Sequence, residues 1–276
     1  KVVHHVILFR VDPSQVAEAQ GLDAAAPGRG WRCFGDSGLS VDPEDTLDDA
    51  DWVSAWAPGG EGGRFPDGTG VSLEAGSRIV MQVHYNLLNG RAPDRSEALL
   101  TTAPASAKLT PLRTMLLPAP VELPCAEDEQ GRLCNRDAAI AELGRKYGPD
   151  AALVPTGLLF LCGGDPGGDT GVTICDRTIR EPTTIRIAAG HMHLLGSSVT
   201  VELNPDTPRA QVLLDIPRWD FHWQNAYAFV RPVRARPGDV VRVTCRHDVG
   251  KRADGEQGVA KTPRYILWGE GTTDEM

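Results

Sequence analysis

The stretch SRIVMQVHY at residues 77–85 is the clearest strand signal in the chain. Apolar residues alternate in it with Gln82 and His84, and this period of two is that of an extended strand. We therefore expect a strand over residues 77–87, with Gln82 and His84 on the same face. The fold is expected to be built from strands of this kind.

Similar short segments occur along most of the chain, separated by turn-forming glycine and proline. Two helices interrupt them. A short one is expected at 14–20, after Pro13, and a longer one at 136–147, where Asn135 is a good N-cap. The other expected strands lie near 2–10, 31–34, 52–56, 156–161, 183–190, 197–203, 210–215, 227–234, 239–247 and 263–268.

Composition supports a β architecture rich in turns. Of 276 residues, 30 are glycine and 21 are proline, while aromatic residues make up only 6%. We expect an all-β chain of two antiparallel, jelly-roll-like β-sandwich domains in tandem, with one short helical insertion in the second. The turn-rich segment 89–94 is the best candidate linker, so the domains are expected to be 1–91 and 92–276.

Charge and hydropathy exclude some partners. The net charge is −9 and no basic run is present, which argues against nucleic acid and anionic membranes. The longest apolar runs are well short of the roughly 18 residues of a membrane span. The chain opens in a strand pattern and stops at Met276 without a polar tail, so we expect it to be part of a longer protein.

The six cysteines contain no C-x-x-C pair, which argues against a zinc knuckle or a thioredoxin-type site. Cys125 and Cys134 flank one polar loop, and Cys162 and Cys175 flank another. Local disulfides at these two places would imply an oxidising compartment and a secreted or extracytoplasmic protein. The alternative is a set of free, buried thiols in a cytosolic protein.

Potential metal ligands are concentrated in a few places. Five of the seven histidines occur in three short motifs, and Met276 ends a Gly-rich acidic segment. Imidazole suits copper, and a thioether suits its reduced form. Two histidines at i and i+2 share one strand face, whereas two adjacent ones can reach a single ion only at a bulge, a twist or a strand end. The candidate ligands are His4, His5, His84, His191, His193 and Met276.

Each motif also has a simpler structural interpretation. His191 and His193 could be hydrogen-bonded core or surface residues, His84 could be structural, and Met276 could be a core side chain. The combination is more informative than any member. The motifs HHVILF (4–9), MQVHY (81–85), GHMHLLG (190–196) and GTTDEM (271–276) follow one another in this order.

This series resembles the copper type II, ascorbate-dependent monooxygenases, the family of peptidylglycine α-hydroxylating monooxygenase and dopamine β-monooxygenase, and looks most like its bacterial branch. The resemblance implies two copper ions per chain, O₂ as oxidant, ascorbate as reductant, and a small-molecule or peptide-like substrate that is hydroxylated at a C–H bond. It places His4, His5 and His84 on the electron-transfer copper. It places His191, His193 and Met276 on the copper where oxygen and substrate react.

The resemblance also assigns Gln82 a place beside the first site, and it implies that the partners of Cys33 and Cys245 lie outside this chain. A Cys33–Cys245 disulfide is the alternative. Peptide-hydroxylating members carry an arginine two residues before the H-x-H motif, where this chain has Ala189. A peptidylglycine substrate is therefore not supported.

Other readings remain open. The same ligands would serve a secreted copper carrier or scavenger without turnover, or could persist in a purely structural module. GDSG at 35–38 copies a serine-protease motif, but its setting favours a turn. The aromatic run 219–223 could line a pocket, although a packing cluster is the simpler interpretation. His222 and His247 are expected to be ordinary polar histidines.

Overall fold

A computed structural model describes residues 2–28, 30–40, 47–60, 63–86, 90–164, 171–252, 262–271 and 274–276. Lys1, Leu87, Asn89, Thr272 and Thr273, which belong to the segments discussed for the sequence, lie outside these ranges. The described chain is mainly β, as predicted. It divides into two compact units, Lys1–Leu116 and Leu117–Met276.

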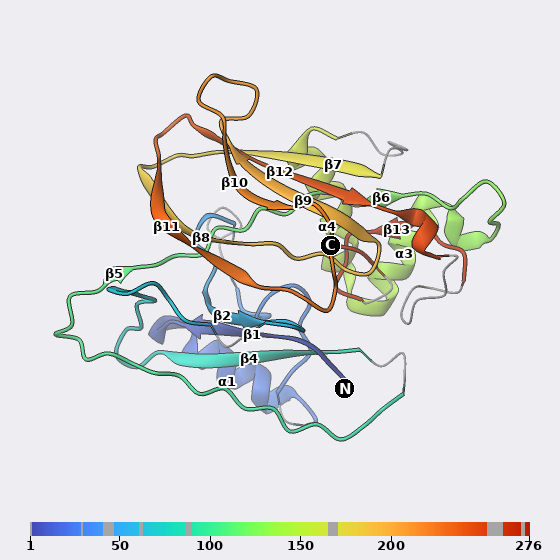
Figure 1. Ribbon diagram of the computed structural model, residues 1–276. Helices are drawn as coiled ribbons and strands as arrows, with labels where there is room; N and C mark the ends of the chain where they lie inside the picture. The colour runs from blue at the N-terminus through green and yellow to red at the C-terminus, as the bar shows by residue number, and fades with distance from the viewer. Residues whose placement is uncertain are drawn as a thin grey trace. The chain divides into compact units, whose positions relative to one another are not determined.

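The first unit is built around a three-stranded antiparallel sheet of order β2-β1-β4 (Figure 1). Two very short strands, β3 and β5, form a separate parallel pair. A 3-10 turn, η1, leads directly into α1. The elements are β1 (Val3–Val11), η1 (Pro13–Gln15), α1 (Val16–Ala25), β2 (Trp52–Trp56), β3 (Thr69–Gly70), β4 (Arg78–Tyr85) and β5 (Thr110–Pro111).

The central strand β1 is buried on both faces, which explains why its sequence is a nearly continuous apolar run. Ile7, Leu8 and Phe9 are each less than a tenth exposed. Each fully buried side chain of this size contributes about 1.5–3 kcal/mol to folding. At the far end of the strand, Val11 packs with Ala19 of α1, so the helix covers this end of the sheet. The rigid strand pair β1–β4 carries the histidine motifs of this unit.

The division between the units falls after Leu116, whereas the sequence pattern predicted a break after Arg91. The intervening segment stays with the first unit because its backbone bonds to it. The amide of Leu116 donates to the carbonyl of Leu47 at 2.7 Å, and the amide of Ala50 donates to the carbonyl of Thr114 at 2.9 Å. The turn signals around residue 90 therefore mark a loop within the unit.

The second unit contains a four-stranded antiparallel sheet of order β10-β9-β12-β7 and two smaller pairs, β11-β8 and β13-β6 (Figure 1). Valine and leucine from β9 and β12 supply much of its buried apolar surface. The strands are β6 (Glu122–Leu123), β7 (Val172–Thr178), β8 (Thr183–Ala189), β9 (Gly196–Leu203), β10 (Gln211–Ile216), β11 (Ala226–Ala235), β12 (Val240–His247) and β13 (Ile266–Leu267). The sequence pattern missed β7.

Helices of this unit precede the large sheet in sequence. The predicted helix is confirmed as α3 (Arg136–Tyr147), where the side chain of Asn135 accepts a hydrogen bond from the amide of Ala138. The strand predicted at 156–161 is wrong, because this segment belongs to a second helix, α4 (Pro149–Cys162). Short 3-10 turns are η2 (Arg132–Cys134) and η3 (Val249–Arg252). The single helical insertion expected in the second domain is therefore a pair.

The end signals of α4 explain the error. Pro149 lies in the first turn of α4, where its missing N–H removes no hydrogen bond of the helix. Gly163 ends the helix in the left-handed conformation, at φ 66°. Its run of apolar residues is equally typical of a buried strand. Two further differences occur in the first unit. The helix expected at 14–20 continues to Ala25, and the described residues 31–34 form no strand.

Both predicted disulfides are present, Cys125–Cys134 and Cys162–Cys175. The second joins the end of α4 to β7 and so ties the helical pair to the large sheet. Within the described ranges, no disulfide includes Cys33 or Cys245. Among the described helices, none has both the length and the apolar character needed to cross a bilayer.

Cys245 and Cys33 are expected to differ sharply in reactivity. Burial in β12 raises the pKa of the Cys245 thiol to about 12, with the nearby Glu275 charge acting in the same direction. Only about one thiol in 10,000 is then a thiolate at pH 8, and the thiolate is the nucleophile. We expect iodoacetamide to label half-buried Cys33 at least about tenfold faster in the native protein, as followed by mass spectrometry. Equal labelling in denaturant is the control, and equal native rates would contradict the prediction.

Candidate metal sites

The first candidate site is formed where β1 and β4 pair. His5 lies opposite His84 in the antiparallel register, at the distance of a cross-strand pair. The register shifts between Val3 and His5, so His4 occupies the irregular position. Such a bulge re-aims a side chain that would otherwise point to the other face of the sheet. Two adjacent histidines can reach one point only at a bulge, a twist or a strand end, and β1 has such an irregularity at His4.

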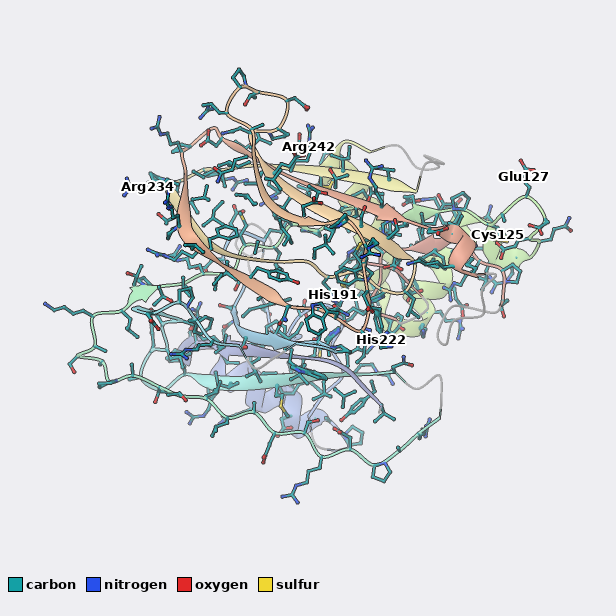
Figure 2. All side chains as sticks on the ribbon, in the orientation of Figure 1. Cys125, Glu127, His191, His222, Arg234 and Arg242 are labelled. Carbon is teal, nitrogen blue, oxygen red and sulfur yellow. A yellow bond between two sulfur atoms is a disulfide. The ribbon has the colours of Figure 1, made fainter. Side chains whose placement is uncertain are left out.

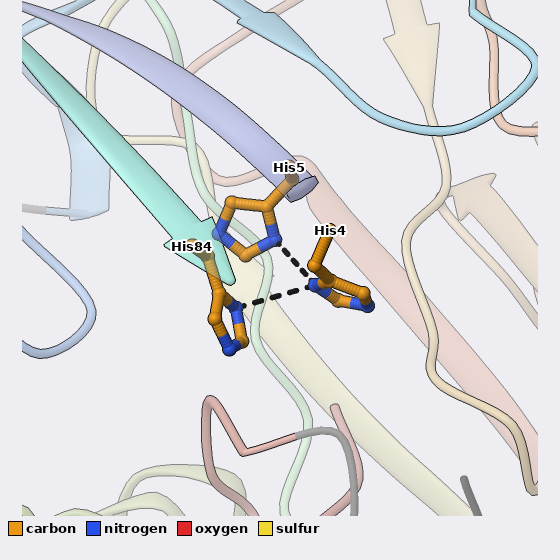
Figure 3. Close-up of side chains that lie close together, drawn as sticks. All are labelled: His4, His5 and His84. Atoms are coloured by element: carbon orange, nitrogen blue, oxygen red, sulfur yellow. Dashed lines mark hydrogen bonds between the residues drawn. The ribbon is translucent and has the colours of Figure 1, made fainter. Parts of the chain in front are cut away.

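The three rings converge closely (Figure 3). Nδ1 of His4 lies 3.1 Å from Nδ1 of His5 and 3.2 Å from Nδ1 of His84. The ring centroids are 4.6–5.0 Å apart in all three pairs. His4 and His5 are 2% and 5% exposed, and His84 is half-buried. One nitrogen from each ring lies within 4.8 Å of the others, a grouping that could hold a metal ion.

A cation at this point could satisfy all three rings at once, whereas hydrogen bonds between the rings cannot. A neutral imidazole nitrogen is either one donor or one acceptor. Nδ1 of His4 faces two other Nδ1 atoms and can match only one of them well. By contrast, three lone pairs can all point at one cation. Nitrogens 3.1–3.2 Å apart, each about 2.0 Å from an ion, subtend roughly 100° at it, which is a normal coordination angle.

Gln82 shares the polar face of β4 with His84, as predicted, but its amide contacts the loop around residues 33–36. Its Nε2 donates to the backbone carbonyl of Asp36 at 2.9 Å and lies 3.5 Å from Sγ of Cys33. The side chain is 6% exposed. Gln82 therefore fastens the loop around residues 33–36 to the strand that carries His84.

The second candidate site contains the H-x-H motif, which lies in the connection between β8 and β9 and not on a strand as expected. The rings of His191 and His193 are nevertheless close, with centroids 5.3 Å apart and planes at 89°. Met192 between them is fully buried and packs near Gly196. The two histidines thus come together through the turn that leads into β9.

Each of these rings is oriented by a partner at Nδ1. Nδ1 of His191 lies 2.6 Å from Oε1 of Gln224, and Nδ1 of His193 lies 3.1 Å from the carbonyl oxygen of Asp274. Both partners are acceptors, so each Nδ1 carries the proton and each Nε2 carries the lone pair. Burial lowers the pKa of His191, and the bond to Gln224 opposes this. A neutral ring with a fixed tautomer is the form that ligates metals.

Glu275 holds the end of the chain against this motif. Its fully buried carboxylate accepts hydrogen bonds from the amides of His193, Leu195 (2.7 Å) and Met276 (3.2 Å). Burial raises its pKa to about 7 against the effect of these donors. One side chain therefore fixes the backbone of both His193 and Met276, the expected ligands from distant parts of the sequence.

No role for Gln224 or Glu275 was predicted from the sequence. Gln224 lies 33 residues after His191, in a loop without a recognisable motif, so no local pattern could connect the two. Glu275 was visible in the GTTDEM motif, and an acidic residue beside a candidate ligand was a usable signal. His222 is exposed, as expected of an ordinary polar histidine. His247 is only 8% exposed and is therefore a buried histidine.

No protein-family model matches this chain, and no curated protein matches it.

Proposed function

We propose that this chain is a copper-dependent monooxygenase that hydroxylates a substrate C–H bond with O₂ and a reductant such as ascorbate. The convergence of His4, His5 and His84 on one point is the observation that carries the proposal. We assign the second ligand set to the paired rings of His191 and His193 and to Met276, whose backbone amide bonds to the same Glu275 carboxylate as the amide of His193. The proposal includes two ions per chain, one at each set.

The donor atoms favour copper over other metals. Three imidazoles suit copper, zinc, iron or nickel, but a thioether in the other set favours copper in its reduced state. When bound, copper would supply one-electron redox chemistry and the activation of O₂. The overall reaction is R–H + O₂ + 2 e⁻ + 2 H⁺ → R–OH + H₂O, in which oxidation of ascorbate provides the two electrons.

The protein's own groups perform the positioning. The β1–β4 register and the bulge at His4 bring one nitrogen from each of three rings within 4.8 Å of one another. Gln224 and the Asp274 carbonyl fix the tautomers of the other two rings, so that their Nε2 lone pairs are available in a set orientation. Such outer partners typically change metal affinity or activity by about 10–100-fold when removed.

We also propose that the two units are β-sandwich domains and that the protein works in an oxidising, extracytoplasmic compartment. The antiparallel sheets of each unit support the first statement. The disulfides Cys125–Cys134 and Cys162–Cys175 support the second, because such bonds are rare in reducing compartments.

The direct test is copper analysis followed by oxygen uptake. Protein loaded with Cu(II) and passed over a desalting column is expected to retain two ions, as measured by mass spectrometry. Ascorbate should then drive oxygen uptake that depends on an added organic substrate and yields its hydroxylated product. Free copper at the same concentration corrects for uncatalysed ascorbate oxidation. Copper retention without product would favour a copper carrier, and failure to retain copper would overturn both functions.

A Gln224→Leu variant is expected to bind copper at the second site about 10–100-fold more weakly, because His191 loses the acceptor that fixes its tautomer. The change preserves the side chain's size and removes its hydrogen bonding. Affinity is best measured by competition titration in a His84→Ala background, where only the second site should bind tightly. Gln211→Ala, at an exposed position of β10, is the matched control. An affinity within twofold of the parent would show that Gln224 does not orient a ligand.

A further inference from the structure

A cleft of about 600 Å³ lies beside the H-x-H motif in the second unit. Its volume falls within the roughly 300–1,000 Å³ usual for small-molecule sites. The aromatic run 219–223, for which the sequence left both a pocket wall and a packing cluster open, contributes to its lining. The residues that matter for recognition are Arg218, Trp219, Phe221, Trp223, Tyr227 and Lys251.

The wall of this cleft is connected directly to the second candidate metal site. Nε1 of Trp219 donates to the carbonyl of His193 at 3.1 Å. Gln224, which contacts His191 through Oε1, donates from Nε2 to the carbonyl of Phe221 at 2.8 Å. Both histidines are thus positioned by the loop that lines the cleft, which also carries His222 (Figure 2). A ligand in the cleft would lie next to the H-x-H segment.

The polar groups of the cleft favour an anion. Asp220 is occupied by its own turn, since its Oδ1 accepts from the amide of His222 at 2.8 Å. Arg218 has no ion-pair partner among the described residues, and its guanidinium is exposed. Lys251 donates to the carbonyl of Gly196 at 2.6 Å, and an ammonium carries two further donors. Two cations against the single carboxylate of Asp220 leave the cleft lining with a net positive charge, in a chain whose net charge is −9.

The apolar groups favour an aromatic body on the same ligand. Trp223 and Tyr227 are 62% and 40% exposed, which leaves ring surface accessible on the cleft wall. Aromatic rings attract one another in offset-stacked or edge-to-face arrangements, in addition to the gain from the apolar area that they bury. An aromatic cage for an organic cation is the competing interpretation, but Arg218 and Lys251 would repel such a ligand.

We propose that this cleft binds a small aromatic carboxylate, with the carboxylate on Arg218 and Lys251 and the ring against Trp223 and Tyr227. The inference rests on the proposed function in one respect, namely that this ligand is the substrate whose C–H bond is hydroxylated. The binding itself requires no metal.

Calorimetric titration of the metal-free protein tests the binding separately. Three probes share one ring and chain length: 3-phenylpropanoate, 3-phenylpropanamide and 3-phenylpropylamine. The carboxylate is expected to bind at least about tenfold more tightly than the amide, and the amine more weakly than either. Arg218→Gln should abolish the preference for the carboxylate, and Trp223→Ala should weaken all probes that bind. Arg234→Gln, an exposed arginine on β11, is the matched control and should change nothing.

The outcomes separate this inference from the proposed function. Equal or tighter binding of the amine, no detectable binding of the carboxylate, or a carboxylate preference that survives Arg218→Gln would each overturn the cleft assignment. None of these results bears on copper retention. Conversely, a carboxylate that binds as expected but is never hydroxylated by copper-loaded protein would leave the cleft in place and count against the monooxygenase.

Discussion

A His84→Ala variant is expected to lose one of two bound copper ions and at least about 100-fold of ascorbate-driven hydroxylation. The imidazole of His84 comes from a different strand than those of His4 and His5. Without it, the site keeps two adjacent ligands and no longer encloses the ion from the β4 side. Because loss of an outer partner alone costs about 10–100-fold, loss of a direct ligand should cost at least as much.

The measurement combines copper content with the Cu(II) resonance spectrum. The variant should retain one ion, and its spectrum should lack the component assigned to the three-histidine set. The metal-free proteins should melt at similar temperatures, because His84 is half-buried and its removal opens little of the core. The parent protein should gain more stability from copper than the variant does, since binding to the native state alone raises stability.

His222→Ala is the control for copper content, because His222 belongs to neither ligand set, is exposed and has its ring 3.6 Å from a carboxylate oxygen of Asp220. It removes a surface imidazole that could bind copper weakly without belonging to either site. If His84→Ala keeps two ions and full turnover while His222→Ala loses one, the assignment of the first site is wrong.

The first site could be predicted from sequence to an unusual degree, because its chemistry is carried by one strand pair. The alternating stretch around His84 specified β4, and the apolar run around His5 specified β1. Their antiparallel register then placed the two histidines opposite each other. Even the irregularity at His4 followed from the pleat, since adjacent side chains of a regular strand face opposite ways. Which strand pairs with which could not be predicted from the sequence alone.

The second site could be predicted less completely, for physical reasons. Its candidate ligands lie on connections, and the groups that orient the two histidine rings come from segments with no periodic pattern. The contact of Gln224 with His191 depends on how the loop after β10 folds back, which is a tertiary event. The error at α4 has a related origin. A short apolar run is compatible with strand or helix, and the decision is made by Pro149, Gly163 and the surrounding packing.

A Glu275→Ala variant is expected to lower the free energy of unfolding of the second unit by about 4 kcal/mol. The carboxylate accepts three backbone amides in a fully buried position, and each donor left unsatisfied costs about 1–3 kcal/mol. Because those amides belong to His193, Leu195 and Met276, the same change releases the end of the chain from the H-x-H segment. Copper affinity at the second site should therefore fall together with stability.

Chemical denaturation of the metal-free protein, followed by a probe in the second unit, measures the loss without interference from metal binding. Glu275→Gln separates hydrogen bonding from packing. It retains the volume and one acceptor oxygen, so it should lose roughly half as much stability as the alanine variant. Glu181→Ala, which removes an exposed carboxylate just before β8, should be within about 0.5 kcal/mol of the parent. A Glu275→Ala loss below 1 kcal/mol would mean that water or the relaxed backbone satisfies these amides. Glu275 would then not be the residue that holds Met276 beside the histidines.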